Sequence, residues 1–283
     1  MMKRADRPEW IKQIERAAGG KAVLLVEGGT DIRILSYFLD KVSSGWNTRF
    51  GLFPVNSKKN VIQAIKTYHP EWVGVIDQDE WSPEYVIKST QELPRIKVLP
   101  RFCLENYFCV PEELWEALPP SLRASLSHGQ EDLTQPLIHA IPDWLAHGAM
   151  WRVIRRKHTR LVYESRFPTE FDSQPITDEQ EIRRIFEAWH TQLDPEQILH
   201  EYRAELSEAN TRTVYEQLTG YVHGKKFFQQ VVTPTLNSLF GQENADIWLE
   251  RFTHEPYGLS LPPDLSHFLQ EVLALCESEI QRE

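Results

Sequence analysis

Acidic residues follow two apolar segments of the chain, at positions suited to binding a metal ion. Glu27 comes directly after the run Ala22 to Val26, and Asp77 and Asp79 follow the run that ends at Ile76. In extended chain, a spacing of two residues points both aspartates the same way. If the two segments are neighbouring parallel strands, the three carboxylates meet at the carboxyl edge of the sheet, where open α/β sheets bind ligands.

Carboxylates gathered in this way repel one another unless a cation neutralises them. Oxygen ligands with room for water and phosphate favour Mg²⁺ or Mn²⁺. The pattern therefore predicts metal-assisted phosphoryl transfer. The alternative is that these acids are solvated residues of ordinary loops between strands and helices. A glutamate before two glycines and an Asp-x-Asp pair at a strand end are both common in such loops.

The elements that must position these acids alternate between strand and helix. Apolar runs predict strands at 22–26, 49–55, 72–76 and 96–99, and helical spacing of apolar residues predicts helices at 30–42 and 59–68. Such alternation predicts an α/β fold with a mainly parallel four-stranded sheet flanked by helices. The segment 8–18 is expected to form a short helix before the sheet.

Strand signals largely stop beyond about Pro111, and prolines separate the expected helical segments. The segments include 178–192, 195–206, 211–218 and 265–279, and the prolines are Pro119, Pro120, Pro136, Pro142, Pro168, Pro175, Pro195, Pro234, Pro262 and Pro263. We therefore expect an N-terminal helix (1–19), a catalytic domain (20–115) and a mostly helical C-terminal domain (116–283). Residues 167–176 are expected to form an exposed loop.

Composition excludes several classes of protein. Of the 283 residues, 41% are apolar and 25% are charged, which is typical of a folded globular chain. The longest aliphatic run is too short for a membrane span, and the N-terminal residues lack an apolar signal core. Three cysteines without CxxC spacing indicate buried thiols in a reducing compartment, so we expect a cytoplasmic protein.

Charge is distributed unevenly along the chain. Residues 1–115 carry 16 Lys and Arg against 15 Asp and Glu, whereas residues 116–283 carry 15 against 26. The dense basic stretch 151–160 interrupts this acidity, and its cations are Arg152, Arg155, Arg156, Lys157 and Arg160. Their spacing on a helix can direct several of them toward nucleic-acid phosphates. The alternative is a solvated helix or a dimer interface.

The segment Val26-Glu27-Gly28-Gly29-Thr30-Asp31, followed by the Asp77-x-Asp79 pair, resembles the Toprim domain of topoisomerases, primases and OLD-type nucleases. The resemblance covers roughly residues 20–110. It implies that Glu27 is a metal ligand or an acid/base group and that Asp77 and Asp79 hold a divalent metal. Asp31 matches a further acidic position of the family, although it also suits simple charge compensation at a helix N-terminus.

A second segment is more specific. Arg101-x-x-x-Glu105-Asn106-Tyr107-Phe108, followed by Pro111-Glu112, resembles the signature of a Toprim family found in bacterial defence operons beside ABC-type ATPases. That family includes the small effector subunit of PARIS anti-phage systems. Glu105 is expected at the start of a helix after the fourth strand, where it can complete a two-metal site. Alternatively, Glu105 caps that helix or pairs with Arg101.

A third candidate lies in His223-Gly224-Lys225-Lys226. OLD-type nucleases carry a late lysine near the metals, and a flexible cation can stabilise charge that develops on a phosphate oxygen. Lys225 is our choice for this role, with Lys226 next. The alternative is an ordinary helix start with two solvated lysines.

The resemblance implies a toxic effector nuclease that cleaves RNA, with tRNA more expected than DNA. It also implies restraint by an ABC-type ATPase partner, for which the acidic C-terminal region is a candidate docking surface, and a homodimer as the active form. Two alternatives to an RNA-cleaving effector remain open. One is a noncatalytic Toprim module that binds or senses, and the other is a Toprim nuclease that nicks DNA.

Spacing argues against other enzymes. The segment from Gly220 to Lys225 is one residue short of a P-loop and lacks the following Ser or Thr, so any ATPase acts in trans. No Asp/Glu-x-Lys, GxGxxG, HExxH or GxSxG motif occurs. A primase is disfavoured because no zinc module is present, and a topoisomerase because no tyrosine has the context of a nucleophile.

Overall fold

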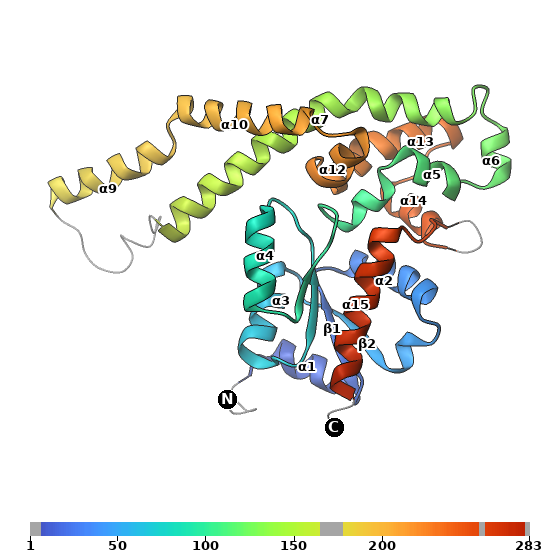
Figure 1. The fold of residues 1–283 in the computed structure, drawn as a ribbon, viewed down its shortest axis with the longest axis horizontal. Coiled ribbons are helices and arrows are strands. Elements are labelled where there is room, and N and C mark those ends of the chain that lie inside the picture. The colour runs from blue at the N-terminus through green and yellow to red at the C-terminus, as the bar shows by residue number, and fades with distance from the viewer. Residues whose placement is uncertain (1–6, 165–177, 255–257, 281–283) are drawn as a thin grey trace. The chain divides into compact units, whose positions relative to one another are not determined.

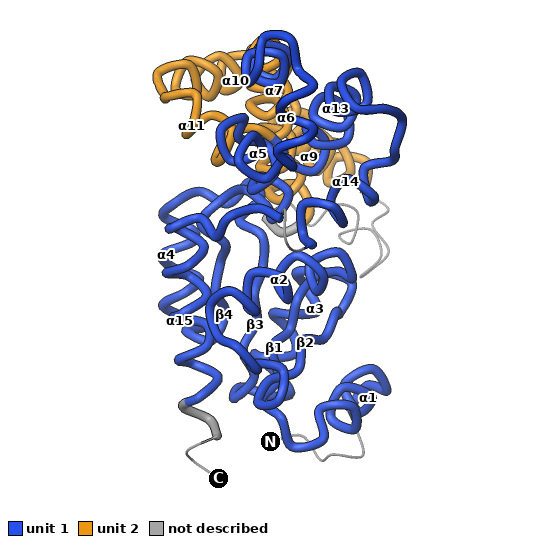
Figure 2. Tube along the Cα trace, turned by 90° about the vertical axis from the view of Figure 1, so that its right-hand side faces the viewer, with its two compact units in different colours: residues 1–137, 223–283 blue, residues 138–222 orange. Residues whose placement is uncertain are grey.

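The computed structural model describes residues 7–164, 178–254 and 258–280, and Figure 1 shows their fold. The loop expected at 167–176 lies outside the described residues. The chain divides into two compact units (Figure 2): unit 1 comprises residues 1–137 and 223–283, and unit 2 comprises residues 138–222.

Unit 1 contains a four-stranded parallel sheet with the strand order β2-β1-β3-β4. The strands are β1 (Ala22–Val26), β2 (Phe50–Pro54), β3 (Val73–Ile76) and β4 (Ile96–Val98). Leu24 and Leu25 of β1 align with Val73 and Gly74 of β3. The expected α/β class and parallel sheet are confirmed, and the first and third strands are neighbours, as the proposed meeting of carboxylates requires.

Helices cover both faces of this sheet. The helices of unit 1 are α1 (Glu9–Ala18), α2 (Gly29–Val42), α3 (Lys58–Gln63, continued by η3, Ala64–Tyr68), α4 (Pro83–Glu92), α5 (Pro111–Ala117), α6 (Pro120–Ala124), α12 (Gly224–Phe227, continued by η7, Phe228–Val232), α13 (Thr233–Phe240), α14 (Ala245–Phe252) and α15 (Pro263–Ile280). Short helical turns form η2 (Trp46–Thr48) and η4 (Leu104–Phe108).

One face of the sheet packs against α1 and α3. Val23 and Leu25 of β1 are buried there with Ile14 of α1 and Val61 of α3. Gly74 permits this close packing, because a Cβ at that position would lie 2.4 Å from Val61 Cγ1. The alternation of side chains along the strands thus buries apolar groups on this face up to the carboxyl edge.

The opposite face involves α2 and the C-terminal helix α15, which packs on β1 and β3 (Figure 1). The Tyr37 hydroxyl of α2 donates a hydrogen bond to the Leu259 carbonyl oxygen at 2.8 Å, and Lys97 of β4 pairs with Glu271 of α15 at 2.6 Å. Residues 258–280 therefore complete the sheet unit. The sequence analysis placed them in a separate domain of residues 116–283, because their helical pattern does not reveal which layer they cover.

Unit 2 is helical. It contains most of α7 (Gln130–Thr159), then η5 (Arg160–Glu164), α9 (Glu179–Gln192), α10 (Pro195–Asn210), α11 (Val214–Glu216) and η6 (Gln217–Tyr221). The expectation that Pro136 and Pro142 separate helices was wrong, because α7 runs through both. A buried stripe at four-residue spacing stabilises this long helix against the lost backbone hydrogen bonds; its members are Leu133, Leu137, Ile141, Leu145, Ala149 and Val153.

None of the helices in the described part of the chain has the length and apolar character needed to cross a bilayer.

Candidate active site

Glu27 and Asp77 meet at the carboxyl edge of the sheet. Glu27 directly follows β1, and Asp77 directly follows β3. The backbone N–H of Asp77 donates a hydrogen bond to Glu27 Oε1 at 3.0 Å. This contact follows from the pairing of β1 with β3, since neighbouring parallel strands end at the same edge. The two residues are thus in contact at this edge, as we expected for the ends of two neighbouring strands.

Asp79 reaches the same edge by a different backbone path from the one expected. Its φ of 50° is left-handed, so the chain after Asp77 is not extended. The N–H of Asp79 donates to the Phe102 carbonyl oxygen at 2.8 Å, which ties this turn to the segment after β4. The carboxylate of Asp79 accepts a hydrogen bond from Lys58 Nζ at 2.6 Å.

Asp31 has the role at a helix N-terminus that its position allowed, and its role as a metal ligand stays a prediction. At the start of α2, its Oδ2 accepts a hydrogen bond from the Gly28 N–H at 2.8 Å, so it caps the helix. Burial raises the pKa of Asp31 to about 6, the Glu105 carboxylate also raises it, and the Lys225 ammonium opposes both. Asp31 is therefore electrostatically linked to two other candidates.

Glu105 lies in η4 and is 8% exposed. The turn is fixed by Asn106, whose Oδ1 accepts a hydrogen bond from the Cys103 N–H at 2.9 Å. Arg101 directs its guanidinium to Glu113, at 2.6 Å, and to Asp264, at 2.9 Å. Arg101 also donates to the Asn106 carbonyl oxygen of η4 at 3.3 Å, so it links η4 to α5 and α15 and has a structural role in the position of Glu105.

We call Glu27, Asp31, Asp77, Asp79 and Glu105 the carboxylate cluster. Burial raises the pKa of Asp77 well above its ordinary value, and the charges of the other four members raise it further. Burial also raises the pKa of Glu27 to about 6, although Lys58 and the N–H of Asp77 oppose the increase. The five carboxyl groups therefore act on one another, as groups that share one site do.

Lys225 is the second residue of α12 and lies near this cluster. Gly224 packs so closely on η4 that a Cβ there would lie 2.2 Å from Asn106 Oδ1. The thiol of Cys109 also contacts the Gly224 carbonyl oxygen at 3.7 Å. This contact brings a segment more than 100 residues away to the cluster. The Lys225 side chain is exposed, and its charge lowers the pKa of Asp31.

Sequence reasoning missed Lys58. It is the first residue of α3, its side chain is 16% exposed, and its ammonium lies 4.6 Å from the centre of the Trp81 ring. Because β2 is a neighbour of β1, the loop after β2 reaches the same edge as Glu27. The signal in the sequence was a lysine at the start of the helix that follows the second strand, but the strand order is needed to place it at this edge.

The donor set suits a hard divalent cation, because it consists of carboxylate oxygens. Within residues 7–164, 178–254 and 258–280, however, no three His, Cys, Asp or Glu side chains are grouped so as to hold a metal ion. The carboxylates have protein partners instead: Glu27 accepts from an amide, Asp31 caps a helix and Asp79 pairs with Lys58. Side chains must turn before these oxygens can surround one ion.

The basic stretch lies in unit 2, and Arg152, Arg156 and Lys157 contact residues of that unit. Lys157 is buried and pairs with Glu201 at 2.7 Å, and Arg156 pairs with Glu205. Arg152 donates to the Gly220 carbonyl oxygen. These three side chains stabilise the packing of α7 in unit 2. Arg155 is exposed and Arg160 is half-buried.

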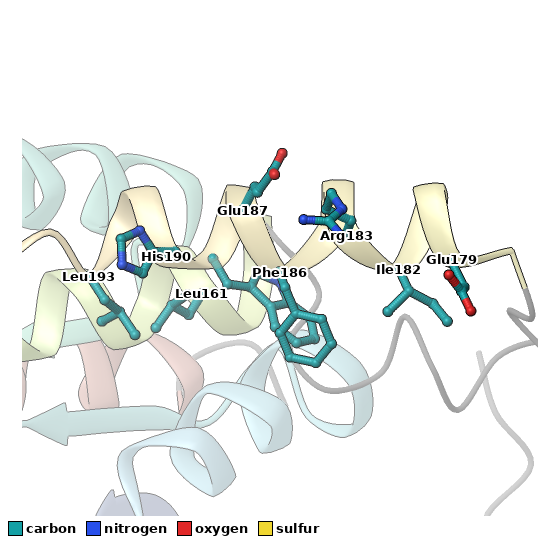
Figure 3. A pocket seen from close by; sticks show the side chains of 9 residues that line it. Leu161, Glu179, Ile182, Arg183, Phe186, Glu187, His190 and Leu193 are labelled. Carbon is teal, nitrogen blue, oxygen red and sulfur yellow. The ribbon is translucent and has the colours of Figure 1, made fainter.

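Unit 2 also contains an apolar groove of about 860 Å³ between η5 and α9 (Figure 3). Ile182, Phe186 and Leu193 lie on the same side of α9 as Leu161, whereas Glu187 points away from them (Figure 3). Phe186 is 54% exposed. The exposed lining of the groove is mostly apolar, although Glu179, Arg183, Glu187 and His190 also contribute to it.

Comparison of the chain with protein-family models, with curated proteins and with solved structures gave no match.

Proposed function

We propose that this protein is a divalent-metal-dependent nuclease with a Toprim-type catalytic domain. The observation that carries the proposal is the meeting of Glu27 with Asp77 at the carboxyl edge of the sheet, among three further carboxylates and near Lys225. Structural acids rarely gather without a cation, because each added charge raises the free energy of the others. The raised pKa values of Glu27, Asp31 and Asp77, to which neighbouring carboxylates contribute, therefore favour a functional site.

The resident cation would be Mg²⁺ or Mn²⁺, which supplies Lewis-acid stabilisation of a phosphodiester when bound. Asp77 and Asp79 are the proposed ligands, with Glu105 and Asp31 as further oxygen donors. Glu27 serves as a ligand or as the group that accepts a proton, since a carboxyl group with a pKa near 6 is a competent base at neutral pH. Lys225 stabilises negative charge on the phosphate.

The proposed substrate is RNA, and tRNA in particular, because the Arg101-x-x-x-Glu105-Asn106-Tyr107-Phe108 segment resembles that of anti-phage effectors. The same resemblance supports a role as the toxic subunit of a PARIS-like defence system, restrained by an ABC-type ATPase and active as a homodimer. Arg155 and Arg160 remain candidates for phosphate contacts. Arg152, Arg156 and Lys157 would have to leave the partners described above to make such contacts.

Purified protein incubated with total tRNA and with supercoiled plasmid tests the proposal. We expect cleavage of tRNA in Mg²⁺ or Mn²⁺ but not in EDTA. Glu27→Gln and Asp77→Asn should each reduce the rate by at least about 100-fold, the scale of a lost acid/base group. Glu116→Gln, an exposed acid on α5, is the matched control and should cleave at the wild-type rate.

A noncatalytic module is the second candidate, and the absence of an assembled ligand group among the described residues favours it. It predicts metal binding that is lost in Asp77→Asn, with no cleavage of either substrate. Nicking of the plasmid without cleavage of tRNA would instead identify a DNA nuclease. Equal cleavage by the wild type and Glu27→Gln would remove the site assignment altogether.

A further inference from the structure

Lys58 pairs with Asp79, one of the carboxylates proposed to hold the metal ion. Its Nζ lies 2.6 Å from Asp79 Oδ2, and the pair is mostly shielded, with exposed side-chain fractions of 16% for Lys58 and 32% for Asp79. The Trp81 ring, 4.6 Å from the ammonium, covers it further. A shielded pair of this kind is held more firmly than a surface ion pair.

The backbone around Lys58 directs it to the cluster. Asn56 turns the chain after β2 with a left-handed φ of 66°, and Ser57 caps α3 by accepting a hydrogen bond from the Asn60 N–H at 3.2 Å. The Asn60 side-chain amide donates to the Val55 carbonyl oxygen at 2.6 Å, which closes the turn. Val55 itself donates its N–H to Val26, the residue before Glu27.

Lys58 and a divalent ion compete for the carboxylate of Asp79. Both need the electron pairs of Asp79, and at close range in a shielded site two cations repel strongly. The Lys58 charge already acts beyond Asp79, since it also lowers the pKa of Glu27. The lysine thus neutralises part of the charge that a metal ion would neutralise, and it gives Asp79 a partner other than the ion.

We propose that Lys58 is an internal counter-ion that holds Asp79 in the metal-free protein and that the metal displaces it on binding. The proposal rests on the metal site of the proposed function and deepens it, because it names the residue that sets metal affinity. Lys58 then acts as a positioning residue: it keeps the carboxylates together without metal and releases Asp79 when the metal arrives.

Binding of Mn²⁺ to the full-length protein, measured by calorimetry and by the electron paramagnetic resonance of free Mn²⁺, tests this competition. Lys58→Met should bind Mn²⁺ about ten-fold more tightly than the wild type, within the usual range for two coupled binding events. Lys58→Arg should bind more weakly than the wild type, since a guanidinium can hold a carboxylate with two hydrogen bonds. Lys59→Met removes an exposed neighbouring charge and should leave the affinity within two-fold.

If the metal displaces residue 58 from Asp79, the affinity for Mn²⁺ is highest with Met at position 58, lower with Lys and lowest with Arg. Simple charge repulsion predicts instead that the Lys and Arg proteins bind Mn²⁺ equally well. Affinity that is unchanged or reduced in Lys58→Met would overturn the proposal, as would equal affinity for Lys and Arg. Lys58→Gln serves as a second uncharged variant if Lys58→Met does not fold, with circular dichroism as the check.

Failure of this inference and failure of the proposed function give different results. If the variants bind Mn²⁺ in the expected order of affinity but tRNA and plasmid stay intact, the counter-ion proposal is supported and the nuclease proposal is not. If tRNA is cleaved but the order of affinities is absent, the nuclease proposal is supported and the counter-ion proposal is not. Absence of Mn²⁺ binding in both the wild type and Lys58→Met overturns both.

Discussion

At the scale of single residues, the acids could be predicted and their basic partner could not. Glu27 and Asp77 stand at strand ends, and the apolar runs before them locate those ends in the sequence. Lys58 precedes Lys59 at the start of a helix, which in sequence is indistinguishable from a solvated pair of lysines. The structure shows that it is Lys58 that pairs with the partly exposed carboxylate of Asp79.

The raised pKa of Glu27, about 6 against an ordinary value of 4.5, predicts a pH dependence of stability without metal. Between these values the folded state binds more protons than the unfolded state, so stability falls as pH rises. The penalty is complete above about pH 6 and absent below about pH 4.5. Glu27→Gln should therefore stabilise the metal-free protein at pH 7.5, by about 2 kcal/mol at most, but not at pH 4.5.

Urea unfolding in EDTA at the two pH values measures this difference. Glu116→Gln is again the control, since an exposed acid carries no comparable penalty. A Glu27→Gln variant that is less stable than the wild type at pH 7.5 would show that the carboxylate of Glu27 is stabilised, rather than strained, by its surroundings.

At the scale of elements, the sequence predicts most strands and helices but not the contacts between distant helices. The four strands lie within one or two residues of their expected bounds, because buried parallel strands are continuous apolar runs. The helix α4 was not predicted from the sequence, and none of its residues is buried in the structure. The docking of α12 on η4 was invisible for a different reason, since it depends on the absence of a side chain at Gly224.

Gly224→Ala tests that contact. The added methyl group would meet both the side chain and the backbone of Asn106, so the segment must shift. We expect a loss of about 1–3 kcal/mol in the free energy of unfolding, as for other overpacked positions. If Lys225 acts on the substrate, nuclease activity should fall further than stability explains.

Gly220→Ala is the matched control, because a Cβ at Gly220 would meet nothing within 4 Å. Chemical denaturation and tRNA cleavage, measured on both variants at a temperature where both are folded, separate the two effects. Wild-type stability in Gly224→Ala would mean that α12 does not depend on this close approach.

At the scale of the whole molecule, the sheet unit is assembled from two stretches of the chain with unit 2 between them. Sequence reasoning placed a domain boundary after residue 115, where strand signals end, because periodicity reports an element's type but not its neighbours. Arg101 shows how the stretches are joined: it is 1% exposed and binds Glu113 in the first stretch and Asp264 in the second.

Arg101→Met should therefore destabilise the sheet unit. It leaves the carboxylates of Glu113 and Asp264 without their shared cation, and breaking a shielded ion pair in this way costs about 3–5 kcal/mol. Arg212→Met breaks an exposed pair with Glu208 and should cost about 1 kcal/mol or less. Hydrogen exchange of β1 and α15 locates the effect, and equal losses in the two variants would contradict it.

The late position of α15 in the chain has a consequence for synthesis in the cell. The sheet is encoded within the first hundred residues, yet one of its faces lacks the cover of α15 until residues 263–280 have left the ribosome. Asp264, the partner of Arg101, emerges with α15, and the segment that carries Lys225 emerges before α15 but after the whole sheet. A nascent chain therefore cannot bring Lys225 to the carboxylate cluster before these segments emerge, and the nuclease proposed above would stay inactive while its own sheet is being synthesised.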